Sequence, residues 1–147
     1  MKRVVIVAAL SSILWFSCER VDAVSEADAK LMGDTAKYTT VQWMDTVVSF
    51  GAVNKGEQVN VTFRFRNTGT QPLILASVRA ACGCTIPDYT KGAVAPGGEG
   101  EVTGAFDTNK SQTGEVRKSI FVTTNTKNKT RQTLIFTGLV KEGTVKN

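Results

Sequence analysis

Residues 59–66, with the sequence Val-Asn-Val-Thr-Phe-Arg-Phe-Arg, contain the pattern that decides the fold. Every second side chain is apolar and those between are polar: Val59, Val61, Phe63 and Phe65 alternate with Asn60, Thr62, Arg64 and Arg66. A period of two is that of a β-strand with one face on a hydrophobic core and the other in water. The stretch therefore predicts a half-buried strand.

Similar segments, separated by turns, lie on both sides of this strand. Residues 67–70 and 96–98 have the composition of turns. The more continuously apolar run at 73–78 predicts a buried central strand. Further strands are predicted at 101–106, at 116–122, at 131–140, and near the start of the domain at 41–44 or 47–50.

This rhythm of about seven short strands separated by turns is typical of a two-sheet protein. Between residues 40 and 141 the sequence shows no helical pattern. We therefore predict an all-β, immunoglobulin-like antiparallel β-sandwich. The inter-sheet disulfide of antibody domains is not expected, because Cys82 and Cys84 are adjacent on one segment.

The first residues of the chain have the features of an export signal. Lys2 and Arg3 precede an apolar run from Val4 to Leu14, and Ser17 stands directly before Cys18. The apolar run is shorter than the roughly 20 residues that a helix needs to cross a bilayer. We predict a lipoprotein signal peptide that is cleaved before Cys18, with plain secretion as the alternative. The expected location is the bacterial cell envelope, lipid-anchored, at the periplasmic or outer-membrane face.

The rest of the chain has room for one domain, since about 130 residues remain after cleavage. Residues 19–39 are polar and alanine-rich, and they lack the apolar stripe of a packed helix. We therefore predict a signal peptide at 1–17, a lipidated cysteine and flexible tether at 18–39, the sandwich at 40–141, and a tail at 142–147.

Composition argues against several functional classes. Histidine is absent, which excludes Ser-His-Asp and Cys-His nucleophiles and every His-containing zinc site. The net charge of +5 is spread along the sequence and includes Lys2 and Arg3, which leave with the signal. An exported chain with scattered basic residues is not expected to bind nucleic acid. We predict no enzyme activity, no cofactor and no resident metal.

Cys82 and Cys84, with Gly83 between them and Thr85 after them, form the only stretch with plausible chemistry. In an extended strand their Cα atoms would lie about 6.6–6.8 Å apart, near the upper limit for a disulfide, and Gly83 could bend the chain to shorten this distance. Three alternatives follow. The pair could be a structural disulfide or packed thiols, it could be redox-active, or it could bind copper(I), since two thiols without histidine cannot complete a zinc site.

The cysteine motif and its surroundings resemble a known bacterial family. The residues concerned are Phe50-Gly51-Ala52-Val53, Gly56-Glu57, the run from Val61 to Gly69, Pro72-Leu73, Cys82-Gly83-Cys84-Thr85 and Pro87. This arrangement is similar to the family catalogued as domain of unknown function 1573, over residues 47–140. The resemblance implies an immunoglobulin-like sandwich, often displayed by envelope lipoproteins and distantly similar to the protein-binding major-sperm-protein and hydin-type modules. It implies no reaction and no catalytic residues.

Two functional hypotheses result. The first, which we adopt as the prediction, is a non-catalytic envelope lipoprotein that binds a protein or a glycan through a sheet edge or a loop end. The second is a thiol protein that uses Cys82 and Cys84 for redox exchange or copper(I) binding. The expected partners are the membrane, through the lipid on Cys18, and an envelope protein or glycan.

Overall fold

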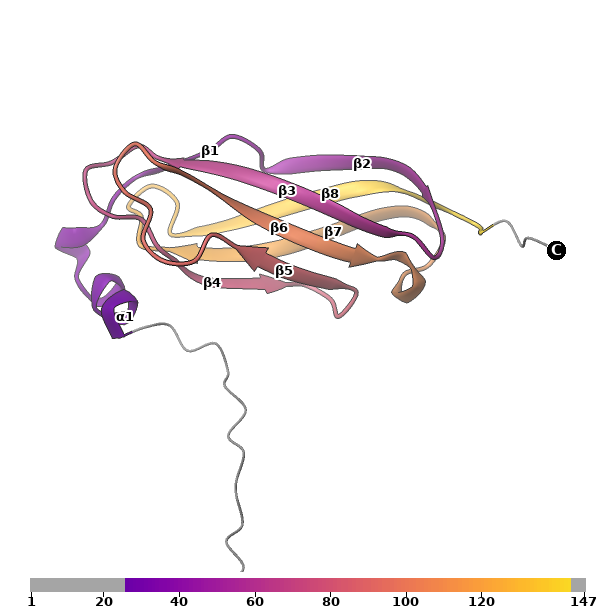
Figure 1. The fold of residues 1–147 in the computed structure, drawn as a ribbon, viewed down its shortest axis with the longest axis horizontal. Helices are drawn as coiled ribbons and strands as arrows, with labels where there is room; N and C mark the ends of the chain where they lie inside the picture. Colours follow the sequence, from indigo (N-terminus) through magenta and orange to yellow (C-terminus); the bar gives the residue numbers. More distant parts are fainter. Residues whose placement is uncertain (1–25, 144–147) are drawn as a thin grey trace, which may run out of the picture.

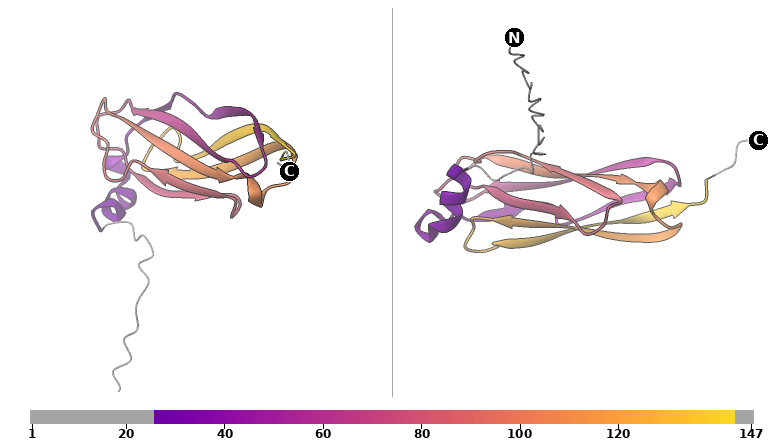
Figure 2. Two further views of the ribbon diagram at one scale, coloured as in Figure 1. Left: turned by 45° about the vertical axis from the view of Figure 1, so that its right-hand side comes forward. Right: turned by 90° about the horizontal axis from the view of Figure 1, so that it is seen from below.

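The computed structural model describes residues 26–143, which fold into two four-stranded sheets packed face to face (Figure 1 and Figure 2). The strands are β1 (Val41–Trp43), β2 (Val47–Asn54), β3 (Gln58–Asn67), β4 (Leu75–Ala80), β5 (Thr85–Tyr89), β6 (Glu99–Asp107), β7 (Gly114–Thr124) and β8 (Arg131–Lys141). One sheet has the order β1-β3-β6-β5 and the other the order β2-β8-β7-β4. The predicted all-β sandwich is confirmed.

Helical structure in residues 26–143 is short. It consists of α1 (Glu26–Gly33) and two 3₁₀ turns, η1 (Thr35–Lys37) and η2 (Thr108–Lys110). In this part of the chain no helix combines the length and the hydrophobicity that a membrane span requires. Figure 1 shows α1 at one end of the sandwich and the β4–β5 turn and η2 toward the other end.

The strand that decides the fold is β3, and its side chains alternate as predicted. Val61, Phe63 and Phe65 are at most 2% exposed, whereas Asn60, Thr62, Arg64 and Arg66 are exposed on the outer face. On β6 and β8 the predicted inward residues Val102, Phe106, Leu134, Phe136 and Val140 are likewise buried. Burial of these alternate faces supplies the main driving force for packing the two sheets together.

An aromatic cluster joins the sheets at the centre of this core. Phe106 on β6 lies 5.5 Å from Phe136 on β8 and 5.8 Å from Phe50 on β2, between ring centroids. All pairs are tilted, an arrangement that aromatic rings favour over face-to-face stacking. Gly138 makes room for this cluster, because a Cβ atom at that position would collide with the ring of Phe50.

The start of the domain differs from the prediction of about seven antiparallel strands. Residues 41–44 and 47–50 were alternatives, but both segments contain strands, because the chain crosses from one sheet to the other after Trp43. β1 pairs antiparallel with β3. β2 then enters the opposite sheet and pairs with β8 in parallel, from Val47 opposite Ile135 to Asn54 opposite Lys141. The structure therefore has eight strands in residues 26–143 and one parallel pair.

The prediction of a central strand at 73–78 is wrong, because β4 starts at Leu75 and lies at the edge of its sheet. Leu73 and Ile74 are buried for a different reason: they lie under the loops at the α1 end. Leu73 forms an isolated bridge with Val94, and the Ile74 amide donates to Asn125 Oδ1 at 2.8 Å. The continuous apolar run thus reflects a segment that precedes β4 and is buried under loops, in addition to the start of the strand itself.

β5 was not predicted, because it contains Pro87. The Asp107 amide donates to the Cys84 carbonyl, and the Thr90 amide donates to the Glu101 carbonyl. In an antiparallel pair the bonding positions alternate, so Pro87 occupies a position whose missing N–H would point away from β6. Proline is compatible with an edge strand in that orientation.

Part of the segment predicted to be a tether is structured. Residues 26–33 form α1, and Asp34 caps η1 by accepting a hydrogen bond from the Ala36 amide at 3.0 Å. Thr39 is buried and bridges to Thr126 in the β7–β8 loop. Local capping and this bridge hold the segment against the sandwich. The predicted signal peptide, Cys18 and the end of the tail, 144–147, lie outside the described residues.

A buried polar cluster fastens the loops at the α1 end. Asn67 is fully buried, and its side-chain carbonyl accepts from Thr39 Oγ1 at 2.8 Å while its amide donates to the carbonyls of Gln71 and Val94. Asn125, also fully buried, donates to the Pro72 carbonyl. Because each buried amide finds partners, the loops here are held by directional bonds as well as by packing.

Candidate functional site

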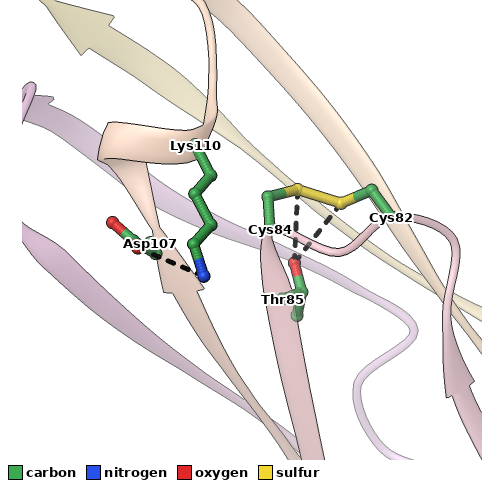
Figure 3. The surroundings of a disulfide bond; sticks show 5 residues. All are labelled: Cys82, Cys84, Thr85, Asp107 and Lys110. Carbon is green, nitrogen blue, oxygen red and sulfur yellow. Dashed lines mark hydrogen bonds and ion pairs between the residues drawn. A yellow bond between two sulfur atoms is a disulfide. The ribbon is translucent and has the colours of Figure 1, made fainter.

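Cys82 and Cys84 form a disulfide in the turn between β4 and β5 (Figure 3). Their Cα atoms are 5.3 Å apart, which is shorter than in an extended strand because the chain bends at Gly83. Cys82 is partly exposed, Gly83 is exposed, and Cys84 is only 6% exposed. Cys18, the predicted lipidation site, lies outside the described residues.

Thr85 and the start of η2 lie next to this bond. Thr85 is 5% exposed, and its hydroxyl oxygen lies 3.9 Å from each sulfur. Asp107 donates its backbone N–H to the Cys84 carbonyl, and its carboxylate pairs with Lys110 at 3.8 Å. Figure 3 shows the Lys110 side chain, with its ion pair to Asp107, among the surroundings of the disulfide. The disulfide thus has a hydroxyl group in contact and an ion pair as a neighbour.

The disulfide is expected to contribute little to stability. Its loop contains three residues, so the loss of unfolded-chain entropy amounts to about 1.6 kcal/mol, against roughly 3 kcal/mol for a 15-residue loop. Reduction of the purified protein should therefore lower the free energy of unfolding in urea by about 1–2 kcal/mol. The C82S/C84S variant should show no response to reductant. A loss above roughly 3 kcal/mol would make the bond a main structural staple.

Metal binding would need further groups or an open disulfide. Within residues 26–143 no cluster of three or more His, Cys, Asp or Glu side chains is placed to hold a metal ion. Copper(I) could bind two thiolates, but in this structure the two sulfurs are bonded to each other. The disulfide turn as it stands can only undergo exchange with another sulfur compound.

A second feature of interest is the outer face of the β2-β8-β7-β4 sheet. Of the large apolar side chains that are exposed in residues 26–143, Val47 (60%), Phe121 (51%) and Leu139 (39%) lie here. Val47 stands beside Ile135 and Leu139 beside Ala52 in the β2–β8 register, so apolar groups extend across neighbouring strands. Grouped exposure of this kind is more informative than single exposed apolar residues.

The charged residues of the same face are mostly positive. Arg79 on β4 stands opposite Phe121, and Arg117 on β7 stands opposite Thr137. Arg131 and Lys141 lie at the two ends of β8 with the same outward parity, and Glu115 is the acidic residue of the face. Four positive charges less one negative charge leave a net charge of +3. We call this surface the basic face, and it comprises Val47, Arg79, Glu115, Arg117, Phe121, Arg131, Ile135, Leu139 and Lys141.

The other sheet has a different charge pattern on its outer face. Arg64 stands directly opposite Glu101, and Arg66 stands directly opposite Glu99 in the β3–β6 register. Arg64 also pairs with Asp45 at 3.0 Å. The four ion pairs found in residues 26–143 all lie outside the basic face. Charges are therefore compensated locally on one side of the sandwich and left uncompensated on the other.

A hollow of about 660 Å³ opens on the basic face. It is lined by Gly51, Glu115, Val116, Arg117, Thr137, Gly138 and Leu139. Gly51 leaves open space where a side chain would otherwise stand, and the rim combines an apolar group with one charge of each sign. A hollow of this size could accept a large side chain of a partner.

The basic face was not predicted from the sequence, where the basic residues are spread over three strands. The alternation rule held at most positions, but Phe121 breaks it by placing an aromatic ring at an outward position between Ile120 and Val122, both buried. The outward position of Phe121 was the one sign of this face in the sequence. The net charge of the face could be summed only once the strand order and register were known.

The family of the chain is shown by comparison with known sequences. The family described as Protein of unknown function (DUF1573) matches residues 41–140. The chain belongs to this family. The match begins at the first residue of β1 and ends within β8, so the DUF1573 region coincides with the sandwich. The comparison with curated proteins finds no match.

Solved structures similar to the DUF1573 domain share its architecture. A protein of unknown function from Porphyromonas gingivalis W83 is 19% identical, with a TM-score of 0.62 over 73% of this chain and 49% of that chain. This chain therefore spans about half the length of that protein. The ASH/PapD-like domain 7 of human CEP192 is 12% identical, with a TM-score of 0.56 over 94% and 99%.

A third similar structure is that of the VesB protease from Vibrio cholerae. It is 16% identical, with a TM-score of 0.57 over 69% of this chain and 32% of that one. At these identities the likeness concerns the fold alone. The DUF1573 domain is thus a member of a family of unknown function with a PapD-like, immunoglobulin-like fold.

Proposed function

We propose that the protein is a non-catalytic binding module of the bacterial envelope, tethered by a lipid on Cys18, which docks an acidic partner protein on its basic face. The observation that carries the proposal is the combination, on one outer sheet surface, of exposed apolar side chains with a net charge of +3. A partner with acidic groups around apolar ones would complement both features.

The apolar part of the basic face supplies the contact area of the proposed interface. Phe121 lies on β7, a strand with neighbours on both sides, toward the β7–β8 loop end of the basic face, and half of its surface is exposed. Aromatic anchors of this kind, surrounded by arginines, are frequent hot spots in protein interfaces. Arg79 on β4 stands directly opposite this ring, and Arg117 lies four residues away along β7 on the same face. Both can pair with carboxylates of the partner in a bidentate manner.

The two edges of the β1-β3-β6-β5 sheet are less suitable for docking than the basic face. At the β1 edge, the Val41 amide donates to Asn128 Oδ1 at 3.1 Å, and Asn128 Nδ2 donates to the Val41 carbonyl at 2.8 Å. This side chain occupies the bonding positions that an added strand would use. At the β5 edge, Pro87 lacks a donor and Asp88 adds a charge, both of which disfavour strand addition. We therefore propose docking on the basic face, in place of the sheet edge or loop end expected from the sequence.

The tether fits a role in docking near a membrane. Only seven residues separate Cys18 from Glu26, the first residue of α1. Fully extended, such a segment spans at most roughly 25 Å. A lipid on Cys18 would therefore keep the sandwich close to the bilayer and raise its effective concentration toward a partner in the same membrane.

Site-specific photo-crosslinking in the native host tests this proposal. A benzophenone amino acid at position 121 should yield one discrete protein adduct, because Phe121 is the exposed aromatic side chain of the proposed interface. The same probe at Thr62, exposed on the outer face of the other sheet, should yield none. The R79E/R117E variant should reduce the adduct from position 121 by about tenfold, because both changes introduce like-charge repulsion toward an acidic partner.

The charge control is R66E/K91E. It changes the net charge by the same amount at two exposed positions of the other sheet, Arg66 on β3 and Lys91 in the β5–β6 loop, and should leave the adduct unchanged. No adduct at position 121, equal adducts from positions 62 and 121, or equal losses in both charge variants would each refute docking on the basic face.

A further inference from the structure

The geometry of the β4–β5 turn points to a second activity, which goes beyond the proposed docking function. We infer that Cys82–Cys84 is an exchangeable disulfide, with Cys82 as the sulfur that an incoming thiol attacks and Cys84 as the leaving group. The partner is a dithiol protein of the same compartment. The inference rests on four features of the turn: its place outside the strand ladders, its unequal exposure, the adjacent hydroxyl group and the nearby ammonium group.

The disulfide can open without disturbing the sheets. On one side of the turn, the Ala81 amide donates to the Ser119 carbonyl at 2.9 Å. On the other side, the Asp107 amide donates to the Cys84 carbonyl at 2.9 Å. Cys82 and Gly83 lie between these bonds and belong to neither β4 nor β5. Because the loop closed by the bond is so small, opening it is expected to cost only about 1–2 kcal/mol of stability, so the strand pairing should persist.

The two sulfurs differ in accessibility. Cys82 is partly exposed, whereas Cys84 is 6% exposed and belongs to the buried core cluster. Thiol–disulfide exchange requires the attacking thiolate to reach one sulfur along the disulfide axis. An incoming protein thiol can therefore approach Cys82, while Cys84 remains shielded and retained close by. This is the asymmetry that an exchange site needs for a defined mixed disulfide.

The surroundings favour the thiolate that leaves. Thr85 Oγ1 lies 3.9 Å from the Cys84 sulfur and can donate a hydrogen bond to it once it carries a negative charge. Lys110 lies beside the turn in Figure 3, paired with Asp107 at 3.8 Å. An ammonium group near a cysteine stabilises its thiolate form, and the Asp107 carboxylate reduces this effect in part.

The proposed exchange consists of two successive attacks by thiolates of the partner. A thiolate of the partner attacks Cys82 Sγ, the Cys82–Cys84 bond breaks, and its electron pair leaves on Cys84 Sγ. The second thiolate of the partner then attacks the partner's own sulfur in the mixed disulfide and releases the Cys82 thiolate. The partner dithiol is oxidised to a disulfide, Cys82 and Cys84 are reduced to thiols, and the two protons of the partner thiols end on the two cysteines.

Glutathione redox buffers test the inference on the full chain. With increasing ratios of reduced to oxidised glutathione, the pair should pass completely from disulfide to dithiol, as measured by alkylation and mass spectrometry. Intermediate ratios should produce a single glutathione adduct, mapped to Cys82. Retention of the disulfide in a large excess of reduced glutathione, or mapping of the adduct to Cys84, would overturn the inference.

Variants that keep only one cysteine of the Cys82–Cys84 pair test the proposed asymmetry. In C84S the remaining Cys82 should react with oxidised glutathione at least about tenfold faster than Cys84 does in C82S, because reactivity follows exposure. T85V should slow the attack of reduced glutathione on the disulfide by about fivefold, the equivalent of one lost hydrogen bond, and T85S should restore the rate. Equal rates for Cys82 in C84S and for Cys84 in C82S would refute the assignment of roles.

The exchange experiments and the crosslinking experiments fail independently. R131E removes a charge of the basic face at the end of β8 that is remote from the disulfide turn, leaves both sulfurs in place, and should exchange with glutathione at the rate of the unchanged protein. C82S/C84S leaves the basic face in place and should give the full adduct from position 121. A loss of crosslinking therefore bears on docking alone, and a loss of exchange bears on the disulfide alone.

Discussion

Replacement of Phe136 by alanine is expected to lower the free energy of unfolding by about 3–5 kcal/mol. Phe136 on β8 is fully buried, and its ring lies 5.5 Å from that of Phe106 on the opposite sheet and 6.3 Å from that of Phe50. The change removes a large apolar side chain and leaves a cavity where the two sheets meet. Such cavities close only partly, because neighbouring side chains are held by the strand register.

Urea unfolding, followed by circular dichroism and by the emission of Trp43, measures this effect. Trp43 packs against Phe65 with 5.2 Å between ring centroids, so its emission reports on the core. The matched control is F121A, which removes the same side chain from the outer face, where it is 51% exposed. We expect that change to stay within about 1 kcal/mol. Similar losses in both variants would contradict the assignment of inner and outer faces.

The second large effect is expected for N67A, which should destabilise the domain by about 3 kcal/mol or more. The Asn67 side chain accepts hydrogen bonds from Thr39 Oγ1 and from the Gly69 amide, and it donates to the carbonyls of Gln71 and Val94. Alanine supplies none of these bonds, and groups buried at the α1 end would be left without partners. A buried polar group without a partner costs about 1–3 kcal/mol.

N60A is the control for this prediction. Asn60 lies on the same strand, β3, but on its outer face, where it is exposed. Its replacement should change the free energy of unfolding by no more than about 0.5 kcal/mol. Hydrogen exchange should also show N67A opening the loops around Thr39 and Val94 before the rest of the sandwich. Uniform exchange, or a loss as small as that of N60A, would rule out a fastening role for Asn67.

The strands that could be predicted are those with one face in the hydrophobic core and the other face in water. On β3, β6 and β8 the apolar residues alternate with polar ones, so the period alone identified the strand and its buried face. β5 was not predicted because proline normally interrupts strands. Pro87 is compatible with this strand only because its missing N–H would point away from β6, and the sequence does not show which side of the strand has a neighbour. The run at 73–78 was misassigned because continuous apolarity also results when loops cover a segment, as they cover Leu73 and Ile74.

The candidate sites, too, could be predicted only in part: the sequence identified the residues and not their surroundings. The sequence drew attention to Cys82 and Cys84, and spacing showed that a disulfide was possible once Gly83 bent the chain. It contained no sign that one sulfur is shielded and the other partly exposed, or that Lys110, more than twenty residues away, lies beside the turn. The basic face was equally hidden, since Arg79, Arg117 and Arg131 come together only through the order of three strands.

By itself, the sequence determined the class of the fold, because hydrophobic periodicity is a local property that each strand carries independently of its neighbours. It also narrowed the chemistry, because a chain without histidine lacks the side chain that most hydrolytic and zinc sites use. Only the tertiary structure decided which strands neighbour one another, and therefore where charge gathers on the surface and which sulfur faces water. Those properties are sums over residues distant in sequence, and they exist only once strand order and register are set.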